Sequence, residues 1–384
     1  MKSIFVSIAS YRDPQIIDTI ENLLNNKSGN YKIIIGVCLQ DDPHIFNNFK
    51  YNNHSDIKIK FVDYMESEGV SWARYIIQTE LYDNEDYYFQ IDSHSRVCEN
   101  WDSILVKQLE ECGIEKTIIS TYPNAFNLND TEKSYLKNTT TPYLKISRIL
   151  PNNKIIAVSA GIVKEEFPIL GFWVAAGFIF TYGSWVKDVP YNKDFYFSGE
   201  EDYISVKSFV EGYNVYIPPK TTLWHDYTDN RLESSFKYRP LHWEDHPGKE
   251  ASALPLETIY NSEFKGSSNR SSFDFLDFAK KLSNFNGMVD VIIKLKTENL
   301  IPIDSRKIMV IVFAILDIQQ NEIFRSDIYD EKIINRETDF LKKEIPQQID
   351  NAAAYCIWWI KYEDHTFGVR NQLRIARDRD VYII

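Results

Sequence analysis

The sequence of 384 residues has little cysteine and no long apolar run. Its four cysteines, at positions 38, 98, 112 and 356, show neither the spacing of a zinc knuckle nor that of a redox pair. So few cysteines form no disulfide framework, and we expect a cytoplasmic protein. The longest apolar runs are too short to span a bilayer, and the N-terminus lacks the apolar core and cleavage site of a signal peptide. We therefore expect no transmembrane segment.

Basic charge is also scarce. Lys and Arg number 43 against 55 Asp and Glu, which gives a net charge of −12 and argues against a nucleic-acid partner. Residues 265–384 carry 18 basic and 18 acidic residues, so the whole acidic excess lies in 1–264. The polar stretch 265–272 coincides with this change and reads as a linker. We predict two domains, 1–264 and 273–384.

In the first domain, short apolar runs alternate with amphipathic stretches. This order predicts α/β architecture with a mainly parallel, doubly wound sheet, which binds ligands at the carboxyl ends of its strands. The expected strands are 3–9, 32–39, 57–62, 87–91, 117–121 and 213–217, and the expected helices are 14–24, 71–81, 101–112 and 202–211.

The second domain has a different pattern. After a predicted helix at 273–282, short β-branched or aromatic runs follow one another without helices of similar length. They predict a small, mostly antiparallel β domain, with strands at 289–295, 308–316, 323–328, 355–361 and 373–375. Trp358 and Trp359 mark either an interface or the core of this domain.

The sharpest motif is Asp92-Ser93-His94, which follows the predicted strand 87–91. A carboxylate and an imidazole two residues apart suit Mn²⁺ or another divalent first-row ion. The alternative is a simple turn in which Asp92 caps the next helix, and short motifs often arise by chance.

Four other segments are ambiguous one by one, and their order along the chain favours a functional interpretation. Arg74 opens a helix and can reach the strand ends, or it forms a surface ion pair. The small-residue turn at 171–178 admits a ligand close to its backbone, or packs tightly. The acids at 200–202 begin a helix, where the helix dipole alone accounts for one or two of them. His225, in Trp224-His225-Asp226, is either a ligand or a structural histidine. The cluster 242–246 resembles a second metal site, although a loop over the active site is the simpler interpretation.

In this order, these segments resemble GT-A fold glycosyltransferases, which have a Rossmann-like, doubly wound mixed sheet. More narrowly, the sequence is similar to the cytoplasmic polypeptide (hydroxyproline) N-acetylglucosaminyltransferases, and more distantly to the mucin-type polypeptide N-acetylgalactosaminyltransferases. The resemblance rests on 90–94, 101–102, 171–178, 189–191, 197–201 and 223–225, and covers roughly residues 1–245. Residues 265–384 resemble no family.

The resemblance implies a role for each matched position. Asp92, His94 and His225 would hold Mn²⁺ or Mg²⁺, which would offset the charge that develops on the leaving diphosphate. Glu200 and Glu201 would be the catalytic carboxylates. The UDP-sugar would be bound by Ala9, Tyr11, Arg12, Arg74, Asp92, Ser93, Ala176 and Gly177.

The implied reaction transfers a sugar, most simply GlcNAc, from a UDP-sugar to a hydroxyl of a protein or glycan, with retention of configuration. The C-terminal domain would bind the acceptor, a partner or a second copy of the chain. Two alternatives stay open. A nucleotidyltransferase would usually have a glycine-rich basic loop after the first strand. The segment SIASYRDP at 7–14 has one Arg and no Gly, which argues against this alternative. A non-catalytic binding protein would tolerate substitution of Glu200, Glu201 and His225.

Overall fold

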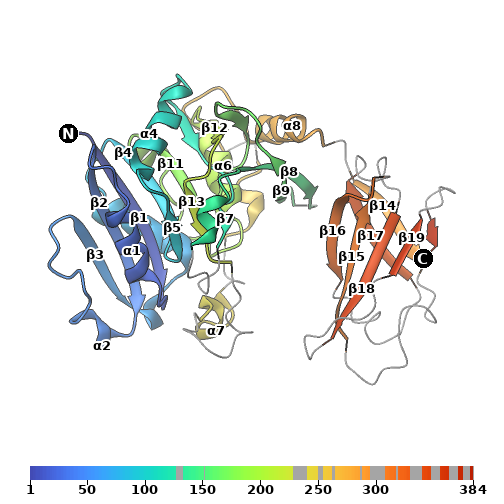
Figure 1. The fold of residues 1–384 in the computed structure, drawn as a ribbon, viewed down its shortest axis with the longest axis horizontal. Coiled ribbons are helices and arrows are strands. Elements are labelled where there is room, and N and C mark those ends of the chain that lie inside the picture. Colours follow the sequence, from blue (N-terminus) through green and yellow to red (C-terminus); the bar gives the residue numbers. More distant parts are fainter. Residues whose placement is uncertain are drawn as a thin grey trace. The chain divides into compact units, whose positions relative to one another are not determined.

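A computed structural model describes most of the chain (Figure 1). The described residues are 1–126, 133–150, 152–227, 240–249, 254–261, 264–285, 288–294, 308–316, 319–328, 340–346, 355–362, 371–374 and 381–383. The chain divides into two compact units, Met1–Ser283 and Asn284–Ile384. Each unit is described by itself.

The first unit is built on an eight-stranded mixed sheet in the order β10-β12-β6-β11-β4-β1-β2-β3. Strands β4, β1, β2 and β3 run parallel, whereas β11 is antiparallel to both of its neighbours and β10 is antiparallel to β12. The strands are β1 (Ser3–Tyr11), β2 (Lys32–Asp41), β3 (Ile57–Asp63), β4 (Tyr87–Asp92), β6 (Thr117–Ile119), β10 (Ile169–Gly171), β11 (Phe178–Tyr182) and β12 (Asn214–Ile217). The predicted strands of this unit all occur, and the sheet is mixed.

Alternation along the central strands sends side chains to two helical layers. Ile4, Val6 and Ile8 of β1 belong to a buried cluster with residues of helices α1 (Ile16–Asn25) and α4 (Trp101–Glu111). On the other face, Tyr88 packs against Trp185, the first residue of α5 (Trp185–Asp188). Trp185 in turn donates a hydrogen bond to Ser208 in α6 (Glu200–Val210), at 3.0 Å. Helix α3 (Val70–Ile76) continues as a π-helical turn, Ile77–Leu81, and contacts β1 and β2.

Two small sheets complete the first unit. One joins β5 (Ser95–Val97), β13 (Leu223–His225) and β7 (Asn124–Ala125) beside the carboxyl end of β4. The other is a hairpin of β8 (Pro142–Ile149) and β9 (Ile155–Ile162), which the sequence did not predict. Short helices α2 (Pro43–Phe46) and α7 (His242–Asp245) lie in loops.

The predicted linker and the helix after it belong to the first unit. Ser267 and Arg270 form hydrogen bonds to Glu211 and Tyr213, at 2.9 and 3.0 Å. Helix α8 (Ser272–Ser283) contacts α6 and β8. The boundary between the two units along the chain therefore falls between residues 283 and 284, whereas the sequence analysis placed it at 265–272.

The second unit contains two sheets among its described residues. One has the order β17-β14-β20 and the other β16-β15-β18-β19. Five strands overlap predicted ones, and β17 and β20 were not predicted. Trp359 packs on a buried cluster of Ala314, Leu316 and Ile357, while the side chain of Trp358 lies outside the description. The strands are β14 (Met288–Lys294), β15 (Ile308–Leu316), β16 (Glu322–Ile328), β17 (Phe340–Pro346), β18 (Tyr355–Tyr362), β19 (Asn371–Arg374) and β20 (Val381–Ile383).

Candidate active site

Three predicted metal ligands meet at the carboxyl end of β4. Asp92 ends β4, His94 lies in the turn to β5, and His225 ends β13, which pairs with β5. The Nε2 atoms of His94 and His225 are 2.9 Å apart, and Nε2 of His225 lies 3.0 Å from Oδ2 of Asp92. A ligand atom from each of the three residues lies within 4.8 Å of the other two. The topology thus gathers residues that are more than 130 positions apart in the sequence.

The chemistry of this group fits a divalent cation. Nδ1 of His94 lies 2.7 Å from Oδ2 of the buried Asp13, which fixes the ring and turns its Nε2 toward the group. Such carboxylate–histidine pairs are usual behind metal-bound imidazoles. Burial by itself would raise the pKa of Asp13, but the hydrogen bond and charge of His94, together with hydrogen bonds from Ser93 and the backbone of Gln15, lower it to about 2. One carboxylate and two imidazoles form a donor set that suits Mn²⁺.

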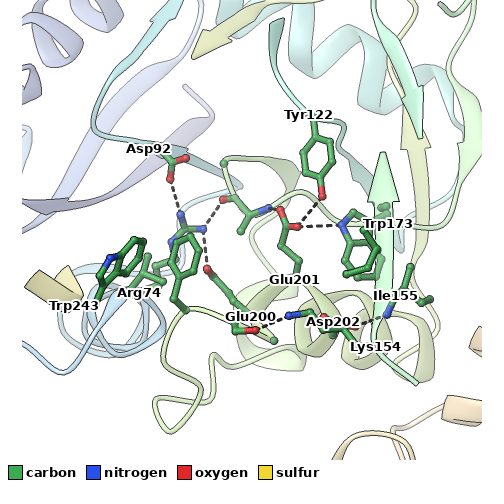
Figure 2. A pocket seen from close by; sticks show the side chains of 18 of the residues that line it. Arg74, Asp92, Tyr122, Lys154, Ile155, Trp173, Glu200, Glu201, Asp202 and Trp243 are labelled. Carbon is green, nitrogen blue, oxygen red and sulfur yellow. Dashed lines mark hydrogen bonds and ion pairs between the residues drawn. The ribbon is translucent and has the colours of Figure 1, made fainter. Parts of the chain in front are cut away.

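Arg74 connects the metal group to the acids of α6. Its side chain is only 2% exposed and lies 2.7 Å from Oδ1 of Asp92 and 3.1 Å from Oε1 of Glu200. It also donates a hydrogen bond to the carbonyl of Ala176 (Figure 2). Burial opposes ionisation of Asp92, but the hydrogen bond from His225 and the charge of Arg74 hold its pKa well below the usual range.

Glu200 and Glu201 begin α6 and have different surroundings. Burial raises the pKa of Glu200 to about 7, and Arg74 offsets part of that rise. The carboxylate of Glu201 accepts hydrogen bonds from the Tyr122 hydroxyl, the Trp173 indole and the backbone of Ala176, at 2.9, 3.2 and 3.0 Å. Burial nevertheless raises its pKa. Figure 2 shows Glu200 directed toward Arg74 and Glu201 toward Tyr122 and Trp173.

Two cavities meet beside Asp92. The larger, about 700 Å³, is lined by Arg74, Glu200, Glu201 and other residues of α6, β9 and the 173–177 turn. The smaller, about 310 Å³, is lined by Ala9, Tyr11, Ser93 and both metal-group histidines, among others. Both cavities are bounded by Val70, Asp92, Phe197 and Trp243. The metal group therefore lies where a ligand that fills both cavities would cross from one to the other.

The predicted donor-binding residues lie around these cavities, with partners that the sequence did not indicate. The Tyr11 hydroxyl donates to Asp245 at 2.6 Å, and Arg12 contacts both oxygens of the same carboxylate, at 3.1 and 2.9 Å. Ser93 donates to Asp13 at 2.6 Å. A Cβ at Gly177 would lie 2.7 Å from Oδ2 of Asp92, so only glycine leaves that carboxylate its space.

The segment 242–246 closes over the smaller cavity. Nε2 of His242 lies 2.7 Å from the Ser67 hydroxyl, and His246 donates to the carbonyl of Tyr64 at 2.9 Å. Both histidines thus have protein partners. Among the described residues, the group at Asp92 is the one cluster that could hold a metal ion, so the structure does not gather a second site at 242–246.

The signals for Asp13 and Asp245 were weak in the sequence. Asp13 lies in the loop after β1 and was visible only as part of the Tyr11-Arg12-Asp13-Pro14 turn. Asp245 ends the short helix α7, which the sequence did not predict, and lies more than 230 residues from the side chains that it binds. In the part of the chain that the structure describes, no helix is long and apolar enough to cross a membrane.

Comparison with solved structures gives weak likenesses. A structure of GalNAc-T7 with UDP, GalNAc and Mn²⁺ is 14% identical, with a TM-score of 0.49, and the match covers 67% of this chain and 47% of that one. Residues 1–349 of S. aureus TarS with UDP-GlcNAc are 14% identical, with a TM-score of 0.38 and 62% of each chain covered. This chain thus spans about half to three fifths of those chains, and likenesses of this strength carry no argument about function. No curated protein sequence matches.

A protein-family model gives the stronger result. The model described as "Glycosyltransferase (GlcNAc)" matches residues 3–44 and 41–253. These segments contain β1, the metal group, Arg74 and the acids of α6, and together they make up well over half of the chain. The chain belongs to the GlcNAc glycosyltransferase family.

Proposed function

We propose that this chain is a GT-A fold glycosyltransferase that transfers GlcNAc from UDP-GlcNAc to a hydroxyl of a protein or glycan, with a divalent cation and with retention of configuration. The observation that carries the proposal is the position of Asp92, His94 and His225 between two adjoining cavities. A sugar nucleotide has a diphosphate between two ring systems, so its charged centre would lie at this junction. The family match favours GlcNAc as the transferred sugar.

The smaller cavity would take the nucleoside. The rings of Tyr11 and His242, with centroids 4.7 Å apart, stand at this cavity and offer apolar faces to a base. The larger cavity would take the sugar and the acceptor hydroxyl, because its polar groups suit sugar hydroxyls. Mn²⁺ or Mg²⁺ held by Asp92, His94 and His225 would neutralise charge that builds on the departing phosphate.

The remaining residues position these groups. Arg74 holds Asp92 by one oxygen, which leaves Oδ2 directed toward His225. Glu201 fixes the 173–177 turn through its bonds to Trp173 and Ala176, and it can orient an acceptor hydroxyl. During transfer, the acceptor oxygen bonds to C1 of the sugar as the bond from C1 to the β-phosphate oxygen breaks. The hydroxyl proton passes to that phosphate oxygen.

Retention by this route needs no protein nucleophile. Glu200 is paired with Arg74, and three donors occupy Glu201, so neither carboxylate stands ready to attack the sugar. Retention would appear as the α-anomer in the first product formed. Proton NMR of the early product tests this part of the proposal, and a β-anomer would show that the reaction inverts.

The test of the main proposal is UDP release from a panel of nucleotide sugars, with Mn²⁺ and with EDTA. Hydrolysis of the donor to water suffices, so no acceptor need be known. We expect release from UDP-GlcNAc that EDTA abolishes and that is lost in His94→Ala. The exposed His44 provides the matched control His44→Ala, which should behave as wild type.

Other outcomes would replace the proposal. Metal-dependent binding of a sugar nucleotide without turnover would indicate a non-catalytic binding protein. Release of pyrophosphate from nucleoside triphosphates would indicate a nucleotidyltransferase. Activity that is equal in His94→Ala and wild type would show that the Asp92 group is not the metal site.

A further inference from the structure

Strand β9 is an exposed edge strand that pairs on one side only among the described residues. Its sequence, IIAVSAGI, has no charged residue and no proline, and residues 158–162 are exposed. Within the described residues, β9 pairs with β8 alone. Natural edge strands usually carry Lys, Pro or a covering segment, because a bare edge recruits another strand. The free edge of β9 is therefore a candidate site for pairing with another strand.

The backbone groups on the free edge can be identified from two hydrogen bonds. The backbone N–H of Ile155 donates to Oδ1 of Asp202 at 3.1 Å, so it points away from β8. The N–H of Ile146, the partner of Ala157 in the register, donates to Ser283 and so points away from β9. In an antiparallel pair, N–H groups alternate in direction along each strand. The N–H groups of Ala157 and Ser159 therefore face outward.

The hairpin is basic in an acidic chain. From residue 142 to residue 163 there are three basic residues, Lys145, Arg148 and Lys154, and no Asp or Glu. No carboxylate of the described residues forms an ion pair with any of the three. A negatively charged segment beside β9 would meet these cations, of which Lys154 also interacts with Asp202 of α6.

The free edge also leads into the proposed active site. Ile155, Ile156 and Ala157 line the larger cavity together with Glu200 and Glu201. A strand paired with β9 would thus pass beside the carboxylates. Only a polypeptide offers the alternating N–H and C=O groups that this edge would bind, and a glycan does not provide them.

We propose that the free edge of β9 binds an extended, acidic segment of a polypeptide acceptor, which adds to the β8–β9 sheet as a third strand and brings its hydroxyl to the larger cavity. This inference rests on the proposed transferase function and selects the protein acceptor over the glycan. The bound side chains would alternate between the cavity and solvent, so a Ser, Thr or hydroxyproline reaches the site in one register only.

The test uses the full-length chain and two pools of eight-residue peptides, which match the eight residues of β9. Each peptide has a central Ser, Thr or hydroxyproline between β-branched residues. One pool carries Asp and Glu at the remaining positions, and the other carries Lys. We expect the acidic pool to raise UDP release from UDP-GlcNAc above the peptide-free rate, and the Lys pool to have little effect.

Ser159→Pro removes one outward N–H, and an edge strand tolerates proline where its N–H faces solvent. Ser159→Val keeps the N–H and is the matched control. Loss of one hydrogen bond should lower kcat/KM for the peptide pool about tenfold in Ser159→Pro, and Ser159→Val should not lower it. Donor hydrolysis without peptide should be the same in both variants and wild type.

Hydrogen exchange provides a readout that is independent of turnover. The amides of Ala157 and Ser159 should exchange rapidly in the free chain and slowly with the acidic pool. Donor hydrolysis with no transfer to peptides, or equal transfer in Ser159→Pro and Ser159→Val, would overturn the inference. Slow exchange of these amides without peptide would also overturn the inference, because the edge would then already be paired. Protection that rises with protein concentration would show that a second copy of the chain covers the edge. Protection that does not change would show that another part of the same chain covers it. Absence of any donor hydrolysis would instead refute the proposed function.

Discussion

Arg74 is the buried cation whose removal tests the electrostatics of the site. Arg74→Met keeps a side chain of similar length but leaves Asp92 and Glu200 without their shared guanidinium. Breaking a buried ion pair by removal of one partner destabilises a protein by about 3–5 kcal/mol. We expect a loss of this size in the free energy of unfolding. Adding Glu200→Gln should recover part of it, because only one buried carboxylate then lacks its partner.

The loss should also depend on pH. Burial raises the pKa of Glu200 from its ordinary 4.5 to about 7, so its contribution to stability is complete below 4.5 and is lost as the pH rises to 7. Above pH 7 the wild-type contribution is flat. Without Arg74 the pKa rises further, so stability should keep falling above pH 7 by up to about 1.4 kcal/mol per pH unit. Glu200→Gln should abolish this extra slope.

Urea unfolding followed by tryptophan fluorescence, from about pH 6 to about pH 8.5, measures both effects. Lys60→Met is the control, because Lys60 pairs with Glu80 at the surface and its removal should change stability by about 1 kcal/mol at most. The reasoning fails if Arg74→Met matches the control at every pH. It also fails if the extra slope persists in the double variant with Glu200→Gln.

Three further substitutions test single contacts. Asp13→Asn should weaken Mn²⁺ binding about 10- to 100-fold in calorimetry, because it loosens the orientation of His94, and unchanged affinity would contradict that role. Gly177→Ala should abolish metal-dependent UDP release while circular dichroism stays that of the folded chain, because its Cβ would displace Asp92. Asp202→Asn should remove a decline in stability of about 3 kcal/mol between pH 4 and pH 6, because burial raises the pKa of Asp202 to about 6. A decline that remains in Asp202→Asn would assign it to other groups.

The sequence predicted the sheet well because its central strands are long apolar runs. A run such as 32–39 is apolar on every side, so it has neither the polar face of a surface helix nor that of an exposed strand. A strand buried on both faces of a sheet is the structure that fits it. Asp92 was recognisable because it directly follows one of these runs. The same logic placed Arg74 near the strand ends, because α3 precedes β4.

The β8–β9 hairpin escaped prediction for the opposite reason. Its strands are partly exposed, and β8 contains basic residues within an apolar pattern that fits neither alternation nor a helix. The partners of the site were hidden by sequence distance. Asp245 binds Tyr11 and Arg12, and Tyr122 binds Glu201, from loops whose paths depend on the whole fold. Local sequence holds no information on such contacts.

The acidity of this chain is compatible with an anionic donor because of where its cations lie. The larger cavity has four carboxylates along its lining, but only Arg74 and Lys154 among its lining residues are basic. Burial raises the pKa of Glu200 to about 7 and the pKa of Asp202 to about 6, so both values lie close to neutral pH. A divalent cation at Asp92 would add the positive charge that both the protein acids and a diphosphate need. In the proposed function, this ion thus allows the diphosphate of the donor to bind beside a cavity that is already lined by acids.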